Sequence, residues 1–160
     1  MKNIIRKILK EDRRQMYLNK IADIMKNDYP IFLNMKEYGF YNQLSGKELT
    51  YVLSVIFGGP VVFRYQKNYI SSNYKVYNSV REEIYFESES GYWRVREFNE
   101  NGYLTYTKTY AGFWEKREYD ENGKVIYIEN SKGEWDKFVY NEKGEKIYWE
   151  KSDGYKEHFR

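Results

Sequence analysis

Residues 112–132 read GFWEKREYDENGKVIYIENSK, and the pattern of this stretch recurs every 21 residues from residue 82 onward. Glycines and aromatic residues keep fixed distances from one another in each copy. The columns in register are Gly91, Gly112, Gly133 and Gly154; Gly102, Gly123 and Gly144; Trp93, Trp114 and Trp135; Phe98, Tyr119 and Tyr140; and Tyr85, Tyr106, Tyr127 and Tyr148. A tandem repeat of this length indicates one supersecondary unit per copy.

Each repeat unit reads as a β-hairpin. Its two runs, 113–119 and 124–128, are rich in aromatic and β-branched residues, which suit a half-buried pleated strand. Asp120-Glu-Asn-Gly123 and Asn130-Ser-Lys-Gly133 close the runs with turn residues, because Asp and Asn can hydrogen-bond their own backbone and Gly adopts positive φ freely. Successive units therefore predict an antiparallel meander.

The odd repeat length adds a condition. Side chains alternate between the two faces of a strand. An odd period therefore moves equivalent residues to opposite faces of the sheet unless the alternation is interrupted once in each repeat. Two turns of which one has an odd and the other an even number of residues, or one β-bulge per repeat, would interrupt it. We expect one of these devices. Within one strand, Trp114, Lys116 and Glu118 share one face, and the other face holds Phe113, Glu115, Arg117 and Tyr119. Neither face is cleanly apolar, which favours a thin sheet with cross-strand Glu–Lys and Glu–Arg pairs.

Composition and charge exclude several classes of protein. The 160 residues include no cysteine, which excludes disulfides, thiolate metal sites and cysteine nucleophiles. No run reaches the roughly 18–20 apolar residues of a membrane span, and the basic N-terminus lacks the apolar core of a signal peptide. A cytoplasmic protein is expected. Residues 1–75 carry a net charge of +7 and residues 76–160 a net charge of −4, so single-stranded nucleic acid on the repeats is disfavoured.

The first 60 residues show helical periodicity instead. Apolar residues follow helical spacing in 3–10 and again in 13–26, and Asp12 with Gln15 resembles a capping box between them, so the sequence is compatible with one helix or with two. The apolar residues assigned to these helices are Ile4, Ile5, Ile8, Leu9, Met16, Tyr17, Ile21, Ile24 and Met25. Pro30 ends this region, and residues 31–41 read as an aromatic linker without a defined structure.

A further helix is predicted over residues 46–57. Ser45 and Glu48 form a capping box, and Gly58-Gly59-Pro60 stops the helix. Its buried face should hold Leu49, Val52, Leu53 and Ile56. The fold class is therefore α+β, with N-terminal α-helices capping a C-terminal antiparallel β-hairpin repeat meander. We divide it into a helical region, 1–60, and a β-hairpin repeat domain, 61–160, with regular repeats over 91–160 and an imperfect repeat over 69–80.

No catalytic or cofactor motif stands out. His158 is the single histidine and lies near the C-terminus, where an ordered general base is rarely found. The Asp120–Gly123 stretch lacks the later ligand positions of a calcium loop and reads as a hairpin turn. Gly58-Gly59 has neither the preceding strand nor the Lys-Ser/Thr of a phosphate loop. We expect no enzyme activity, no metal and no cofactor.

Parts of the repeats resemble a known class of sequence. Gly91-Tyr-Trp, Phe98-Asn-Glu-Asn-Gly102 and Tyr119-Asp-Glu-Asn-Gly123 are similar to the tandem Gly-Tyr-Trp/Tyr-Asp-x-x-Gly repeats of small uncharacterised bacteriophage proteins, with a rhythm like that of MORN and YD (RHS-type) hairpin repeats. The resemblance covers about half of the chain and lacks the extra glycines of MORN repeats, so MORN-type lipid binding does not carry over. It implies a phage origin and a repeat fold, and no activity.

These observations favour a non-enzymatic module that binds a protein, either as a virion component or as an inhibitor of a host factor. Regularly spaced aromatic residues can anchor a partner, although they can equally be the packing between repeats. The candidate binding residues are Trp93, Trp114, Trp135, Tyr106, Tyr127 and Tyr148. Homo-oligomerisation through the sheet edges is a further option. The alternative function is binding of a ligand or nucleic acid by the basic N-terminal helix through Arg6, Arg13 and Arg14, although a solvated helix face has the same composition.

Overall fold

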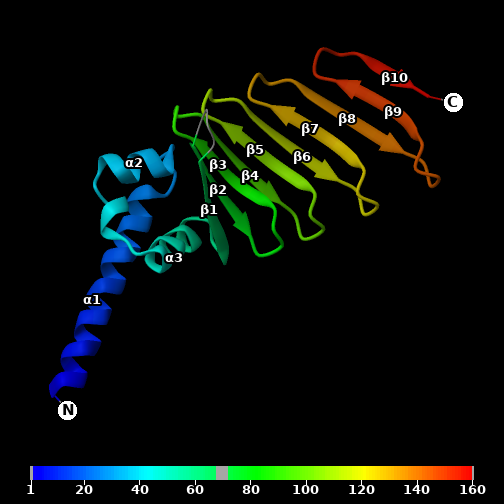
Figure 1. The fold of residues 1–160 in the computed structure, drawn as a ribbon. Coiled ribbons are helices and arrows are strands. Elements are labelled where there is room, and N and C mark those ends of the chain that lie inside the picture. Colours follow the sequence, from blue (N-terminus) through cyan, green and yellow to red (C-terminus); the bar gives the residue numbers. More distant parts are fainter. Residues whose placement is uncertain (1, 68–71, 160) are drawn as a thin grey trace. The chain divides into compact units, whose positions relative to one another are not determined.

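The computed structural model describes the backbone of residues 2–67 and 72–159, and side chains from residue 10 onward (Figure 1). Helices come first in the chain and strands follow. The helices are α1 (Lys2–Met25), α2 (Ile31–Glu37), the short 3-10 helix η1 (Tyr41–Gln43) and α3 (Gly46–Ile56). The strands are β1 (Val61–Lys67), β2 (Ser72–Asn78), β3 (Glu83–Ser88), β4 (Trp93–Phe98), β5 (Leu104–Thr109), β6 (Trp114–Tyr119), β7 (Val125–Asn130), β8 (Trp135–Tyr140), β9 (Lys146–Lys151) and β10 (Lys156–His158).

The α+β class and the meander are confirmed. All ten strands are antiparallel neighbours in one sheet, in the order of the chain. By internal contacts the chain divides into two compact units, Met1–Trp93 and Arg94–Arg160. The first unit thus combines the helices with β1–β3, whereas the sequence-based division separated helices from strands at residue 60. The physical reason is that the helices bury their apolar side chains on these strands.

The N-terminal region forms one helix, not two. Because α1 continues through Asp12, no cap forms there, and the capping-box interpretation of Asp12 and Gln15 is wrong. Met16 is 71% exposed and Ile24 43% exposed, so these two apolar residues with helical spacing lie on the solvent side of α1. The residues that α1 buries are Leu18, Ile21, Ala22 and Met25. The predictions for the side chains of Ile4, Ile5, Ile8 and Leu9 lie outside the described residues, as does Tyr69 of the imperfect repeat.

Helix α3 matches its prediction closely. The Ser45 hydroxyl accepts a hydrogen bond from the Glu48 backbone N–H, and the Glu48 carboxylate accepts one from the Ser45 N–H at 2.8 Å. This reciprocal cap satisfies two donors that the start of a helix leaves unpaired. All four residues of the predicted apolar face are buried: Leu49, Val52, Leu53 and Ile56.

Residues 31–37, expected to be part of a linker, form helix α2. Its N-terminus is held by a strand of the sheet. Glu87 on β3 accepts hydrogen bonds from the backbone N–H groups of Phe32 and Leu33, both at 2.7 Å, and the Tyr85 hydroxyl accepts one from the Ile31 N–H at 2.9 Å. Negative charge at a helix N-terminus is stabilising. A carboxylate distant in sequence therefore performs the capping that no nearby residue provides.

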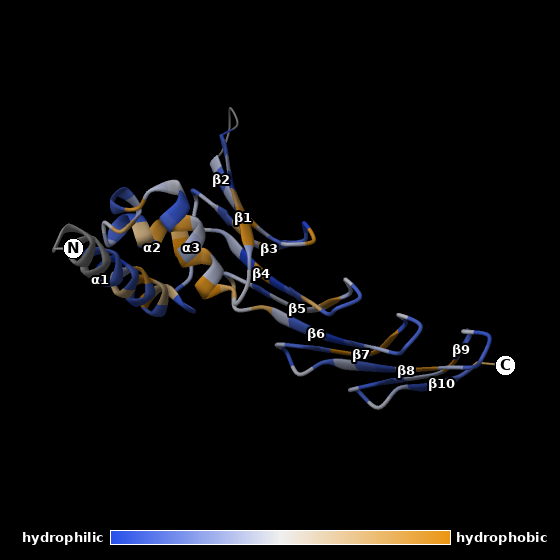
Figure 2. Cartoon of the chain, turned by 90° about the horizontal axis from the view of Figure 1, so that it is seen from below, coloured by the Kyte–Doolittle hydropathy of each residue, from blue (hydrophilic) through white to orange (hydrophobic). Residues whose placement is uncertain are grey.

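Phe32 lies at the centre of the first unit's core. Its ring stacks on those of Tyr74 at 4.6 Å and Phe63 at 5.0 Å between centroids, and it is fully buried. Val76 and Tyr85 complete the strand side of this core. In Figure 2 the apolar residues of this unit gather along α3 and β1, while the strands of the second unit are mainly hydrophilic.

The second unit contains a β-bulge in each repeat, which is one of the two devices that the odd period predicts. The register shifts between Glu97 and Phe98, between Glu118 and Tyr119, and between Val139 and Tyr140. One extra residue per repeat restores the alternation, so equivalent side chains return to the same face every 21 residues. The hairpin turns are as predicted, since the Asp120 carboxylate accepts hydrogen bonds from the N–H groups of Asn122 and Lys124 at 2.9 and 2.8 Å.

The second glycine ladder is fixed by two separate constraints. Gly123 has φ +79°, a conformation that costs an L-residue roughly 1–2 kcal/mol. A side chain from the preceding repeat also occupies the space of a Cβ: the Tyr103 ring lies against Gly123, and the Lys124 ammonium, which donates to the Gly144 carbonyl, lies against Gly144. These two contacts each link one hairpin to its neighbour.

We therefore expect Gly123→Ala to lower the free energy of unfolding by more than Gly112→Ala does. Gly112 has nearly the same φ, +78°, but its Cβ position is open. Each substitution should cost about 1–2 kcal/mol for the backbone, and Gly123→Ala should additionally displace Tyr103 from its stacking contact with Tyr119. Urea unfolding of the two variants measures the difference, and equal losses would show that the contact with Tyr103 contributes nothing.

Candidate binding surface on the repeat sheet

Five of the six predicted aromatic residues lie on one face of the second unit. Cross-strand pairing shows this directly, because paired residues share a face. Tyr106 pairs with Lys116, Lys116 with Glu129, and Glu129 with Trp135. The next row, 21 residues on, runs through Glu118, Tyr127, Lys137, Glu150 and Lys156. We call this surface the Tyr–Trp face, and its aromatic residues are Tyr106, Trp114, Tyr127, Trp135 and Tyr148.

Trp93 is placed differently from the other five. It lies in the first unit, where its ring stacks on Tyr29 with 4.6 Å between centroids. The structure therefore gives Trp93 a packing contact with the segment that leads into α2. This contact distinguishes it from the later tryptophans of the same column.

The tyrosine hydroxyls of the Tyr–Trp face differ in their hydrogen bonding from those of Tyr119 and Tyr140, which form a separate column of the repeat. The hydroxyls of Tyr119 and Tyr140 donate hydrogen bonds to the carbonyls of Leu104 at 2.7 Å and Val125 at 3.0 Å. That column packs one repeat against another. Tyr106 and Tyr127 are half-buried, and within residues 10–67 and 72–159 neither hydroxyl forms a hydrogen bond to the protein. A tyrosine with its ring packed and its hydroxyl open can donate to a partner.

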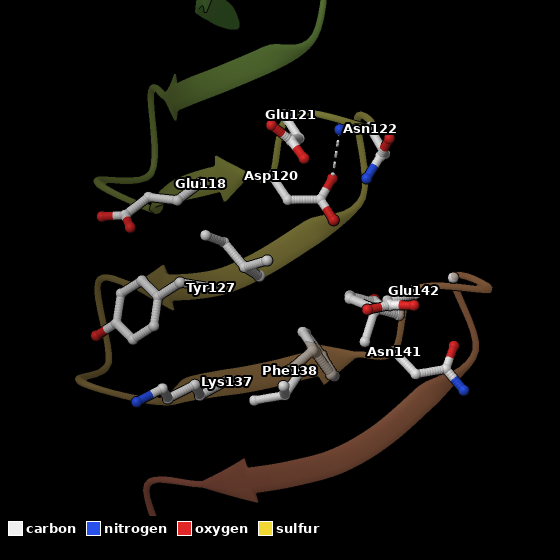
Figure 3. A pocket seen from close by; sticks show the side chains of 13 residues that line it. Glu118, Asp120, Glu121, Asn122, Tyr127, Lys137, Phe138, Asn141 and Glu142 are labelled. Carbon is white, nitrogen blue, oxygen red and sulfur yellow. Dashed lines mark hydrogen bonds between the residues drawn. The ribbon is translucent and has the colours of Figure 1, made fainter.

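A groove of about 680 Å³ crosses the Tyr–Trp face between two hairpin turns (Figure 3). Tyr127 and Lys137 lie at one end of it, and the turn residues Asp120 and Glu142 lie at the other. Ile126, the extra residue of a bulge, contributes apolar surface. A second groove, of about 500 Å³, lies one repeat earlier and includes Glu97, Tyr106 and Lys116.

Burial and nearby carboxylates raise the pKa values of both groove tyrosines. Burial, with Glu97 beside it, raises the pKa of the Tyr106 phenol. Burial, with Glu129 and Glu118, likewise raises the pKa of Tyr127. Both phenols therefore stay protonated at neutral pH and act as neutral hydrogen-bond donors next to carboxylates.

Of the three basic residues predicted to contact an anionic surface, the structure describes the side chains of Arg13 and Arg14. Arg13 is exposed on α1. The Arg14 guanidinium forms an ion pair with Glu48 at 2.6 Å and donates to the Gln43 carbonyl at 2.8 Å, so it joins α1 to α3. This pairing holds the pKa of Glu48 at about 2. The side chain of Arg6 lies outside the described residues.

Other chemistry finds little support in the part of the chain that the structure describes. There, no group of three or more His, Asp or Glu residues is close enough to hold a metal ion. The His158 ring lies 4.9 Å from that of Tyr148, on the exposed last strand. Among the described helices, none is both long and apolar enough to cross a membrane.

Sequence reasoning missed the carboxylates of the groove. Glu118, Asp120, Glu121 and Glu142 line it, and only the turn role of Asp120 was recognised. The sequence does contain a signal for one of these carboxylates, because Glu97 and Glu118 precede Tyr106 and Tyr127 by the same number of residues. What the sequence does not display is the cross-strand pairing that puts each glutamate beside its tyrosine.

Comparisons with known proteins leave the chain without an assigned family. No protein-family model matches it, and no curated protein matches it. The resemblance to bacteriophage repeat proteins therefore stays a prediction.

Proposed function

We propose that the chain is a non-enzymatic interaction module that binds a protein partner through the Tyr–Trp face. The observation that carries this proposal is the open hydroxyl of Tyr106 and of Tyr127, each set in a groove of that face. In the phage setting that the sequence resemblance implies, such a module serves as a virion component or as an inhibitor of a host factor. Its place is then the host cytoplasm or the virion.

The composition of the second unit supports this proposal. Its described elements are strands and turns only, so the unit has no helical layer of its own over either face. Of its described apolar residues, Val95 alone is buried. Aromatic rings that remain half-exposed on a rigid sheet can contribute large contact areas at low entropic cost, as anchors of protein interfaces do.

The two tyrosine columns provide a matched test. A double variant with Tyr106→Phe and Tyr127→Phe removes only the open hydroxyls, and we expect it to keep its stability and lose about tenfold or more in affinity for the partner. A double variant with Tyr119→Phe and Tyr140→Phe removes two hydrogen bonds to carbonyls. It should lose about 0.5–1.5 kcal/mol of stability for each bond and keep its affinity while folded.

The measurement is quantitative affinity capture from a cell extract with each immobilised variant, beside thermal unfolding of the same preparations. The wild-type chain should retain a stoichiometric protein that the Tyr106/Tyr127 variant retains poorly. If both double variants retain the partner as the wild type does, the Tyr–Trp face is not the binding surface. A captured protein that only the less stable Tyr119/Tyr140 variant loses would likewise contradict the proposal.

A further inference from the structure

The two grooves of the Tyr–Trp face lie at equivalent positions of successive repeats. Every described residue that lines the smaller groove has its counterpart 21 positions later in the larger one: Glu97 and Glu118, Thr105 and Ile126, Tyr106 and Tyr127, Lys116 and Lys137, Arg117 and Phe138, Glu118 and Val139. Glu118 thus takes part in both grooves. A ligand that fits one groove finds a related site one hairpin away.

The spacing of the grooves favours one ligand conformation. Equivalent residues lie two strands apart, which is about 9.5 Å at roughly 4.8 Å per strand. A polyproline II helix repeats its face every three residues at about 3.1 Å each, or about 9.3 Å. A fully extended peptide repeats its face every two residues, or about 6.6 Å, and misses the second groove. An α-helix returns to the same face after seven residues, or about 10.5 Å, which is longer than the spacing of the grooves.

The charge of the larger groove selects the ligand's side chains. Among the described residues that line it, Glu118, Asp120, Glu121 and Glu142 face a single Lys137. The smaller groove is lined by Glu97 and Glu118 and by Lys116 and Arg117. The Arg117 guanidinium forms an ion pair with Glu115 at 2.6 Å. Carboxylates beside an apolar surface suit the long alkyl stem and charged end of Lys or Arg, whose stem packs while its head stays paired.

We propose that the partner presents a polyproline II segment with Lys or Arg at every third position, laid across strands β5–β8 at right angles to them. Successive basic side chains enter successive grooves, and the open hydroxyls of Tyr106 and Tyr127 donate to backbone carbonyls of the segment. Recognition of this kind uses a helix that is ordered before binding, which lowers the entropic cost. This inference rests on the proposed function and specifies the partner's chemistry.

The test uses synthetic peptides and the full-length chain. One labelled peptide contains four Pro-Pro-Lys triplets, and a second has the same composition with its lysines in one block. A third is helical, with lysines seven residues apart. Fluorescence anisotropy should show that the triplet peptide binds at least about tenfold more tightly than either of the others, with an affinity that falls as salt rises.

Charge variants identify the surface. Glu118→Gln combined with Glu121→Gln should weaken binding of the triplet peptide about tenfold and reduce its salt dependence. Glu134→Gln is the matched control, since this exposed carboxylate belongs to a turn at the other end of the strands and does not line either groove. All three positions are exposed, so unfolding curves should be unchanged.

Equal binding of the triplet and block peptides overturns the proposal, and so does tighter binding of the helical peptide. The proposal is also overturned if Glu134→Gln weakens peptide binding as much as the groove variants do. The peptide would then be attracted by negative charge anywhere on the sheet and not by the grooves. If the triplet peptide fails while capture of a protein still depends on Tyr106 and Tyr127, the inference on the ligand is wrong and the protein-binding function stands. If capture is independent of both tyrosines, the function itself fails.

Discussion

Replacement of Glu87 by alanine is expected to lower the free energy of unfolding by about 2 to 4 kcal/mol. The carboxylate is fully buried and accepts three hydrogen bonds, from the Phe32 and Leu33 N–H groups and from the Tyr85 hydroxyl, all at 2.7 Å. Alanine leaves these donors buried without an acceptor, at about 1–3 kcal/mol each, and part of that cost is offset because no charge is buried any longer. Denaturant unfolding measures the loss, and helix content by circular dichroism should fall as α2 detaches.

Two further variants separate capping from burial. Glu87→Gln keeps one acceptor but turns an amide N–H toward a backbone N–H, so we expect a loss of stability smaller than that of the alanine variant and still measurable. Glu89→Ala is the control, because Glu89 is exposed two residues further on. If Glu87→Ala is no less stable than Glu89→Ala, the carboxylate does not hold the start of α2.

The stability difference should also depend on pH. Burial raises the pKa of Glu87 above its ordinary value, although its three hydrogen bonds and nearby Lys36 partly oppose this. A carboxyl group whose pKa is higher in the folded state contributes most below its unfolded pKa, and that contribution is lost as the pH rises through the raised value. The gap between wild type and Glu87→Ala should therefore widen as the pH falls toward the ordinary carboxyl range, about 4.3.

Phe32→Ala is the second substitution with a large expected effect, about 3 to 5 kcal/mol. The ring is fully buried and stacks on Phe63 and Tyr74, so its removal leaves a cavity where helix and strands meet. Thermal and denaturant unfolding measure the loss. Phe113→Ala is the matched control, because that ring is 37% exposed in a turn of the second unit, and it should change stability by less than about 1 kcal/mol. Similar losses for both variants would show that the core is not centred on Phe32.

Features with local causes could be predicted from the sequence. Helix α3 begins at a capping box that lies within four residues, and the turns that start at Asp120 and Asn130 each combine that residue with a glycine three positions later. The odd period predicted either a bulge in every repeat or two turns of different parity, and the structure shows the bulge. These features need no knowledge of distant residues.

Features with distant causes could not be predicted. Helix α2 depends on Glu87, 55 residues beyond Phe32. The buried side of α1 is set by the elements packed against it, and helical spacing alone does not show that Met16 and Ile24 are exposed while Ile21 and Met25 are buried. On the repeat sheet, the sequence identified the aromatic columns, whereas the grooves required the cross-strand pairing of Glu118 with Tyr127 and of Tyr127 with Lys137.

The bulge in each repeat has a consequence for how such a chain can change over time. Because parity is restored within one unit, an in-frame duplication or deletion of a whole repeat leaves every other side chain on its original side of the sheet. Unequal recombination between neighbouring copies could thus add or remove one groove at a time without redesigning those that remain. Each such event changes the number of grooves by one, and with it the avidity for a partner that repeats its own binding segment.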